Sequence, residues 1–235
     1  MYKKSDINDL QNHINKAVDK VFKNIVDDFP KIQGREEEIT SQFRGEINRH
    51  LIHEIEKSLG GIKLDDFKIH VYTYSKKEEN STGADLAGIL EIDYGTQVLK
   101  KAFLAQAKIC HPVKVISPKG TLTTHYESSN SLILKQAKDM LDITSDSFFF
   151  LYTKTGCLVI PALHVDAIGK NKVNTVDFHY KNLGNFYSEF FQCFIGDHKI
   201  ADIATDSKSL KDYAAKYNVN NVLYIKITTT LDYEE

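Results

Sequence analysis

Residues 85–110 read DLAGILEIDYGTQVLKKAFLAQAKIC, and this stretch decides the expected fold. In its first part, residues 85–93, the apolar residues Leu86, Leu90 and Ile92 alternate with acidic ones, which is the period-two pattern of a β-strand. Its second part, residues 102–110, is again typical of a strand. Only a short turn at Gly95 separates the two parts, so we expect them to form neighbouring strands.

Two polar residues interrupt the second strand. Gln106 and Lys108 are two residues apart, so both side chains project from the same face, roughly 6–7 Å apart along the strand. The opposite face carries the expected core residues Phe103, Ala105, Ala107 and Ile109. Burying a lysine ammonium without a partner is costly, so we expect an anionic group near Lys108. Asp85 and Glu91 lie roughly 20 Å apart on a continuous strand and cannot share one ion, which leaves Asp85 as the carboxylate to consider beside Gln106.

The remaining pattern predicts one domain of the α/β class, a mixed β-sheet flanked by helices with an N-terminal helical segment. Helices are expected over residues 9–29, 35–59, about 128–142, 185–196 and 209–218. Further strands are expected over residues 67–75, 148–153, 157–162 and 222–230, with a polar connection after residue 110. The single domain 1–235 is thus divided into a helical segment 1–34, a core 36–162 and a C-terminal layer 163–235.

Composition excludes several classes of protein. The chain is 42% hydrophobic and 26% charged, as in ordinary globular proteins, and no apolar run approaches the ~18–20 residues of a membrane span. The N-terminal lysines are not followed by the apolar block of a secretory signal, so we expect a cytoplasmic protein without membrane contact. The net charge of −2 argues against a generally basic nucleic-acid-binding surface, but not against a local basic groove. Cys110, Cys157 and Cys193 form no CxxC pair and are expected to be buried thiols.

A family resemblance rests on two short motifs. Thr82-Gly83-Ala84-Asp85-Leu86, followed by Gln106-Ala107-Lys108, resembles the PD-(D/E)XK nuclease superfamily. The GAD…QAK form is similar to its Gln-x-Lys branch, which includes Mrr-like restriction enzymes and antiphage defence nucleases. The segments Glu38-Ile39-Thr40, KQAKDM (135–140) and SFFFLY (147–152) fit the same branch. The resemblance covers about residues 36–162 and implies a restriction-endonuclease-like fold.

The resemblance also implies an activity and a metal. It implies a Mg²⁺- or Mn²⁺-dependent endonuclease that acts in restriction or antiphage defence, with DNA favoured over RNA as its substrate. The implied metal ligands are Asp85, Gln106, the backbone carbonyl of Ala107, and Glu38. Lys108 is the implied catalytic lysine, which positions the attacking water and offsets charge on the phosphate. Gln106 stands where the family usually has an acid.

Other readings remain open at this stage. Lys100, Lys101, Lys114 and Lys119 bracket the motif strand and are candidates for contacts with phosphate, or ordinary surface lysines. Targeting is expected to come from a homo-oligomer or a defence-system partner protein. The alternative function is a non-catalytic nuclease-like domain that binds nucleic acid or a partner protein. An unrelated hydrolase or transferase has no support, because the sequence contains no G-x-S-x-G elbow or Gly-rich phosphate loop.

Overall fold

The computed structural model describes residues 16, 38–40, 42, 45, 66–73, 83–93, 97–116, 120–202 and 207–228. Most of the two helices expected over residues 9–29 and 35–59 lies outside these ranges. Residues 16, 38–40, 42 and 45, which fall within the expected helices, are helical. No helix in the described ranges is long and apolar enough to cross a membrane.

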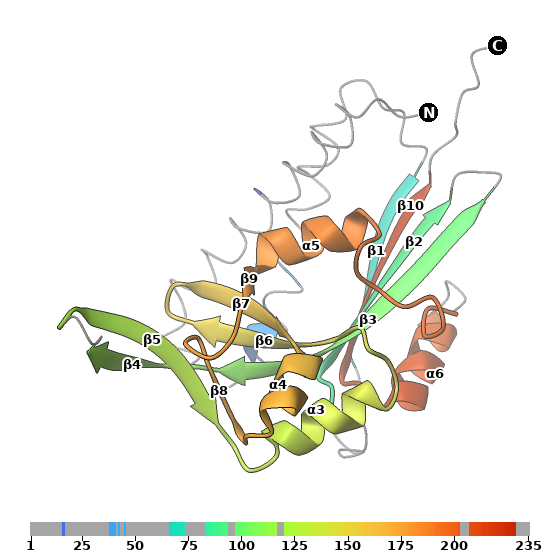
Figure 1. Cartoon of the computed structure of the whole chain (residues 1–235). Coiled ribbons are helices and arrows are strands. Elements are labelled where there is room, and N and C mark those ends of the chain that lie inside the picture. The colour runs from blue at the N-terminus through green and yellow to red at the C-terminus, as the bar shows by residue number, and fades with distance from the viewer. Residues whose placement is uncertain are drawn as a thin grey trace.

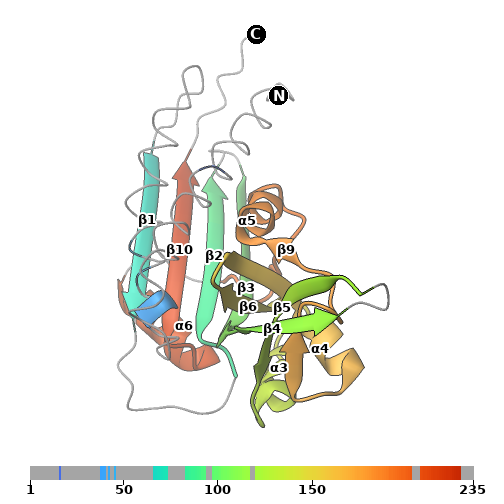
Figure 2. The ribbon, with the colours of Figure 1, turned by 90° about the vertical axis from the view of Figure 1, so that its left-hand side faces the viewer.

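A seven-stranded mixed sheet, sheet A, forms the centre of the molecule (Figures 1 and 2). Its strands, in spatial order, are β1 (Asp66–Thr73), β10 (Asn221–Thr228), β2 (Leu86–Asp93), β3 (Val98–Ile109), β6 (Ser147–Thr153), β7 (Gly156–Pro161) and β9 (Lys181–Asn182). Strand β2 runs parallel to β10 and antiparallel to β3, and β3 runs parallel to β6. The predicted α/β class, with a mixed sheet flanked by helices, is therefore confirmed.

Among the described residues, four helices cover the two faces of sheet A. They are α3 (Ile133–Leu141), α4 (Ala162–Ile168), α5 (Leu183–Phe191) and α6 (Ser207–Tyr217). The first core cluster lies under α5 and includes Ile39, Leu90, Phe103, Ala105, Ala107, Ile109, Phe150, Tyr152, Phe186 and Phe190. The second core cluster lies under α3, α4 and α6 and includes Ala87, Ile89, Ala102, Leu104, Cys110, Ala137, Phe149, Val165, Tyr213 and Tyr224. Figure 1 shows α5 on one side of the sheet and α3, α4 and α6 on the other. Because both faces are buried, the central strands are apolar on both sides.

Phe103 is at the centre of the first core cluster. Its ring meets Phe186 and Phe190 edge-on, with ring centroids 4.9 Å apart in each pair. Gly88 lies opposite Phe103 in the β2–β3 register, and a Cβ at Gly88 would stand 2.2 Å from that ring. The glycine in the middle of β2 therefore makes room for an aromatic ring.

The C-terminal part of the chain departs from the expected arrangement. Residues 163–235 are not a layer added to a finished core, because β10 lies inside sheet A between β1 and β2. The strand was predicted, but its place depends on pairing with β2, which is more than a hundred residues earlier in the sequence, and periodicity carries no information about such pairings. Helix α4 was not expected, and α3 begins several residues later than predicted.

The expected polar connection after residue 110 contains a second, three-stranded sheet. Strands β4 (His111–Ile116) and β5 (Leu122–Ser129) pair antiparallel, and β8 (Lys172–Asn174) pairs with the end of β5. Strands β4 and β5 do not show the alternation of apolar and polar residues that predicts a strand. Most of their side chains are exposed, and the apolar and polar residues do not separate onto two faces. Sheet B, in the order β4-β5-β8, is thus a feature that the sequence did not reveal.

Gly83 provides a test of how the segment before β2 is packed. It has a φ of 71°, and a Cβ there would lie 2.7 Å from the Cα of Gln136 in α3. We expect Gly83→Ala to lower the free energy of unfolding by well over the ~1–2 kcal/mol of left-handed strain alone, because α3 must also move. Gly169→Ala is the matched control, since its φ is 68° but the nearest atom to its Cβ is 3.9 Å away. Equal losses in the two variants, measured by urea unfolding, would contradict the close packing of Gly83 on α3.

Candidate functional site

The register of β2 and β3 brings Asp85 and Gln106 together. Leu86 pairs with Ala105, so the residues on either side, Asp85 and Gln106, are neighbours where β2 begins. The Asp85 N–H donates to the Ala105 carbonyl at 2.9 Å, and the Gln106 Nε2 donates to the Asp85 Oδ2. The prediction that residues 85–93 and 102–110 form neighbouring strands, with Asp85 within reach of Gln106, is confirmed.

The backbone of Ala107 completes this corner. Ala107 lies beyond Ala105, the last residue of β3 that pairs with β2, and its N–H donates to the Asp85 Oδ2 at 3.0 Å. Its carbonyl oxygen accepts a hydrogen bond from Gln106 Nε2 at 3.2 Å. The Gln106 amide therefore lies within hydrogen-bonding reach of both the Asp85 carboxylate and the Ala107 carbonyl. Rotation of the Gln106 amide by a half-turn exchanges its nitrogen for an oxygen, the atom that a cation would bind.

Asp85 is also fixed from its other side. The Asn221 N–H and its side-chain Nδ2 both donate to the Asp85 carbonyl oxygen, at 3.0 and 3.1 Å. Asn221 is buried, and it begins β10. This residue was not predicted, because Asn220-Asn221 falls between the expected helix over residues 209–218 and the expected strand over residues 222–230. Asp85 is thus held by β3 on one side and by β10 on the other.

Lys108 lies on the same face of sheet A as Gln106. The alternate residues of β3, Ala105, Ala107 and Ile109, belong to the first core cluster, as predicted. Gln106 and Lys108 therefore lie on the face of the second core cluster, where they are 3% and 4% exposed. Asp85, which precedes β2, is half-buried. Asp85 is therefore the residue of this group that a ligand approaching from the solvent reaches most directly.

The segment with Glu38 packs against the other face. Ile39 belongs to the first core cluster, and Thr40 Oγ1 lies 3.0 Å from the hydroxyl of Tyr152. Burial, with the negative charge of Asp85 among the smaller causes, raises the pKa of Tyr152 well above its ordinary value. Glu38 itself is half-buried, and its role as a metal ligand stays a prediction.

The prediction that Lys101 contacts phosphate is wrong. Its side chain is 1% exposed and lies on the first-cluster face, opposite to its neighbour Lys100. Its Nζ donates to the Ile195 carbonyl oxygen at 2.8 Å and stands 4.8 Å from the centroid of the Phe190 ring. Burial lowers the pKa of Lys101 to about 8. The sequence pattern could not separate this buried lysine from a surface one, because Lys100 and Lys101 are adjacent.

Lys100 has an internal partner. Its Nζ lies 2.9 Å from Glu91, a buried carboxylate that also pairs with Lys226 at 2.9 Å and accepts a hydrogen bond from Tyr224. Burial alone would raise the pKa of Glu91, but the hydrogen bonds from Lys226, Lys100 and Tyr224 outweigh it and lower that pKa. This ion-paired cluster lies near the far end of β2 from Asp85. The role of Lys100 at phosphate stays a prediction, and its charge is already balanced within the fold.

The other candidate lysines and the cysteines fall into different environments. Lys114 is exposed on β4, as a phosphate contact would require, whereas Lys119 lies outside the described residues. Cys110 and Cys157 are buried thiols that form no disulfide, as expected. Cys193 is exposed, so the prediction that it is buried is wrong. It follows the end of α5 and adopts a φ of 67°, in the turn that closes over Lys101.

The stability of the protein should report the charge state of Lys101. Its pKa of about 8 in the folded state lies below its ordinary value of 10.5, so between these values the unfolded chain binds more protons. Raising the pH through this window therefore stabilises the wild type relative to Lys101→Met. We expect the difference in urea midpoint between the two to grow in favour of the wild type from pH 7.5 to pH 10. The exposed Lys211→Met is the control, and a pH-independent difference for Lys101→Met would contradict the assignment.

The group around Asp85 has a mixed set of oxygen donors. In the part of the chain that the structure describes, no three His, Cys, Asp or Glu side chains lie close enough together to hold a metal ion. Gln106 and the Ala107 carbonyl would therefore have to supply ligand oxygens beside the Asp85 carboxylate. Comparisons of the chain with models of known protein families, with curated proteins and with solved structures find no match.

Proposed function

We propose that the chain is a metal-dependent endonuclease that hydrolyses phosphodiester bonds in nucleic acid, with DNA favoured. The observation that carries the proposal is the contact of the Asp85 carboxylate with the Gln106 amide and the Ala107 N–H, with Lys108 on the same face as Gln106. A restriction-endonuclease-like core is part of the proposal. The antiparallel β2–β3 pair, followed by α3 and by β6 parallel to β3, supports it.

The donor set fits a hard cation. Mg²⁺ in proteins prefers oxygen ligands, keeps several waters, and is commonly bound by only one or two carboxylates together with substrate phosphates. Asp85 provides a carboxylate, and the Gln106 amide contacts both that carboxylate and the Ala107 carbonyl through its nitrogen. After a half-turn of the amide, Gln106 and the Ala107 carbonyl would each provide a neutral oxygen. Glu38 would add a second carboxylate only by reaching the end of β2 from its segment on the first-cluster face. Because two of these donors are uncharged, we expect weak metal affinity without substrate.

The residues divide the chemistry between them. When bound, Mg²⁺ would polarise a phosphate oxygen and lower the pKa of a bound water. Asp85 is oriented for its role by the Ala107 N–H and through its backbone by Asn221. Lys108 would place a positive charge beside the reacting phosphate, and its burial strengthens that effect, since charges interact more strongly away from water. The phosphate would approach from the side of Asp85, which is the more exposed residue.

A second candidate function has one observation in its favour. A non-catalytic nuclease-like domain that binds nucleic acid or a partner protein would need no metal, and Gln106 already satisfies Asp85 through a direct hydrogen bond. Roles in restriction or antiphage defence, and targeting by a second copy or a partner protein, rest on the family resemblance. The two candidate functions differ in one measurable property, the metal-dependent cleavage of nucleic acid.

Plasmid nicking tests the proposal. We expect the purified protein to nick supercoiled DNA with Mg²⁺ or Mn²⁺ and to stop when EDTA is added. Lys108→Ala should lose activity by about 100-fold or more, since it removes a charge that acts on the transition state. Asp85→Asn and Gln106→Ala should also be inactive, whereas Gln106→Glu should be active because it restores the common acid.

Lys138→Ala is the matched control, because Lys138 is an exposed lysine on α3. It should nick as the wild type does. Activity in Lys108→Ala equal to that of Lys138→Ala would remove Lys108 from the mechanism. A wild type that never nicks DNA or RNA with either metal would favour the non-catalytic function.

A further inference from the structure

The β4–β5 hairpin projects from the body of the molecule directly after the candidate site. Strand β4 begins at His111, three residues after Lys108, and leaves sheet A where Cys110 closes the last contact with β6. His111–Ile116 pairs with Leu122–Glu127 in an unbroken antiparallel register. Figures 1 and 2 show this hairpin reaching away from both helical layers, at a steep angle to β1, β10 and β2. We call these two paired segments the ribbon.

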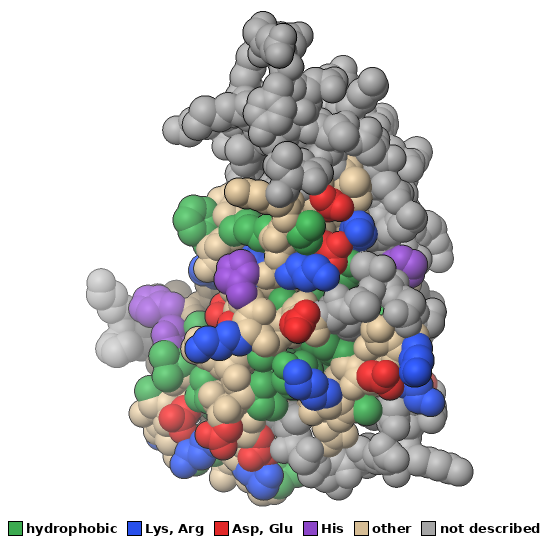
Figure 3. Space-filling view, turned by 90° about the vertical axis from the view of Figure 1, so that its right-hand side faces the viewer, with side chains coloured by type: hydrophobic (Ala, Val, Ile, Leu, Met, Phe, Trp, Pro, Cys, Tyr) green, Lys and Arg blue, Asp and Glu red, His purple; other side chains and the backbone are tan. Residues whose placement is uncertain are grey.

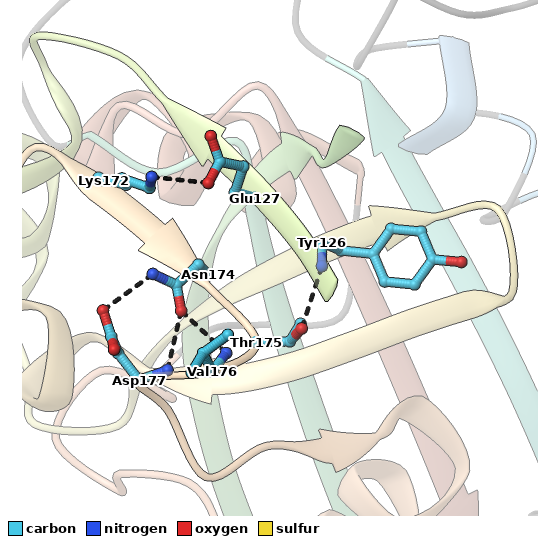
Figure 4. Close-up of polar contacts among 7 residues, drawn as sticks. All are labelled: Tyr126, Glu127, Lys172, Asn174, Thr175, Val176 and Asp177. Carbon is cyan, nitrogen blue, oxygen red and sulfur yellow. Dashed lines mark hydrogen bonds and ion pairs between the residues drawn. The ribbon is translucent and has the colours of Figure 1, made fainter. Parts of the chain in front are cut away.

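The base of the ribbon is held firmly to the body (Figure 4). The Thr175 N–H donates to the Tyr126 carbonyl at 2.9 Å, and the Tyr126 N–H donates to Thr175 Oγ1 at 3.1 Å. Glu127 forms an ion pair with Lys172 at 2.6 Å. The turn that follows β8 is closed by Asn174, whose side chain accepts the N–H groups of Val176 and Asp177. The ribbon is therefore a two-stranded arm that is fixed at one end.

The far end of the ribbon exposes both apolar and basic side chains. Lys114 pairs with Thr124, and Ile116 pairs with Leu122, on one face of the ribbon. All four side chains are exposed, and Ile116 and Leu122 are 71% and 57% exposed. Exposed branched apolar residues at the end of an arm are costly in water unless a partner covers them.

The charge of this part of the chain is one-sided. The chain has 32 acidic residues among 235, yet none of them lies between Asp93 and Glu127. The same stretch contains five lysines, but Lys100 and Lys101 have partners within the fold and Lys108 belongs to the candidate site. Lys114 is the exposed lysine of the described ribbon, which also carries His111 and His125. By contrast, acidic and basic side chains are interspersed among the coloured residues of the face shown in Figure 3. Residues 111–126 contain no carboxylate, and the acidic residue of the ribbon, Glu127 at its base, is paired with Lys172. Such an arm suits a polyanionic partner.

We propose that the ribbon docks duplex DNA by entering its major groove. This inference deepens the proposed nuclease function, on which it rests, by assigning its substrate to the double-stranded form of DNA. Two strands about 4.8 Å apart, with their side chains, match a major groove about 12 Å wide, which admits a two-stranded ribbon. Six paired residues extend about 20 Å, more than the groove depth of about 8.5 Å.

The exposed side chains suit this groove. Ile116 and Leu122 would contact thymine methyl groups, and Lys114 would contact phosphate, which carries most of the affinity. The major groove of A-form RNA is deep and narrow and does not admit side chains, so the ribbon favours DNA over RNA. The scissile phosphate would then lie nearer the base of the ribbon, where β4 begins three residues after Lys108.

Binding measured without catalysis tests the inference. Fluorescence anisotropy of a labelled 24-base-pair DNA in EDTA separates docking from cleavage. We expect Lys114→Glu to weaken duplex binding at least tenfold and to lower the dependence on salt by about one phosphate contact. Lys211→Glu makes the same charge change at an exposed position of α6 and should alter binding less than twofold. The double variant Ile116→Ser, Leu122→Ser should lose more affinity for duplex DNA than for single-stranded DNA.

Three results would overturn the inference. They are equal binding by Lys114→Glu and Lys211→Glu, equal affinity for duplex RNA and duplex DNA, and conversion of an oligomer to a monomer by the apolar double variant with DNA binding unchanged. The last result would identify the ribbon as an interface between copies of the chain. Ribbon-dependent binding without nicking would overturn the nuclease proposal alone, and nicking unaffected by ribbon variants would overturn this inference alone. Circular dichroism of each variant establishes that it is folded.

Discussion

The antiparallel pairing of β2 and β3 is the constraint on which the rest of the structure depends. It places Gly88 against Phe103, so that one aromatic ring can organise the core beneath α5. It also ends at Leu86 and Ala105, one step before Asp85 and Gln106. Beyond that point the Ala107 N–H donates a hydrogen bond to the Asp85 carboxylate. The same ladder thus builds the core and leaves a carboxylate, an amide and a carbonyl together at its end.

The sequence predicted this pair of strands because both are long and central. Their apolar residues must face two buried layers, so the polar residues Asp85, Gln106 and Lys108 are conspicuous interruptions. The contact between Asp85 and Gln106 could be predicted from a short turn and a period of two. The position of β10 could not, because its neighbours are selected by tertiary packing. The support that Asn221 gives to Asp85 depends on that position and was missed with it.

Two lysines on β3 show where pattern reasoning ends. Lys101 and Lys108 both interrupt an apolar strand, and both are almost completely buried. Their positions differ by an odd number of residues, so the alternation of side chains along the strand places them on opposite faces of sheet A. Lys101 meets a backbone carbonyl and an aromatic ring, which serve the fold, whereas Lys108 shares its face with Gln106. Identical residue types in similar sequence surroundings therefore lie in different environments, and only the surrounding helices and turns distinguish them.

The central claim is that Asp85, Gln106 and Ala107 together form a cation site. Anomalous diffraction from a crystal of the wild-type protein soaked in Mn²⁺ tests it most directly, because it locates the metal independently of any activity. The account predicts a peak within bonding distance, about 2.2 Å, of the Asp85 carboxylate and the Ala107 carbonyl oxygen. The same soak of Asp85→Asn should lack that peak. A Mn²⁺ peak elsewhere in the molecule, with none at Asp85 under saturating metal, would contradict the account.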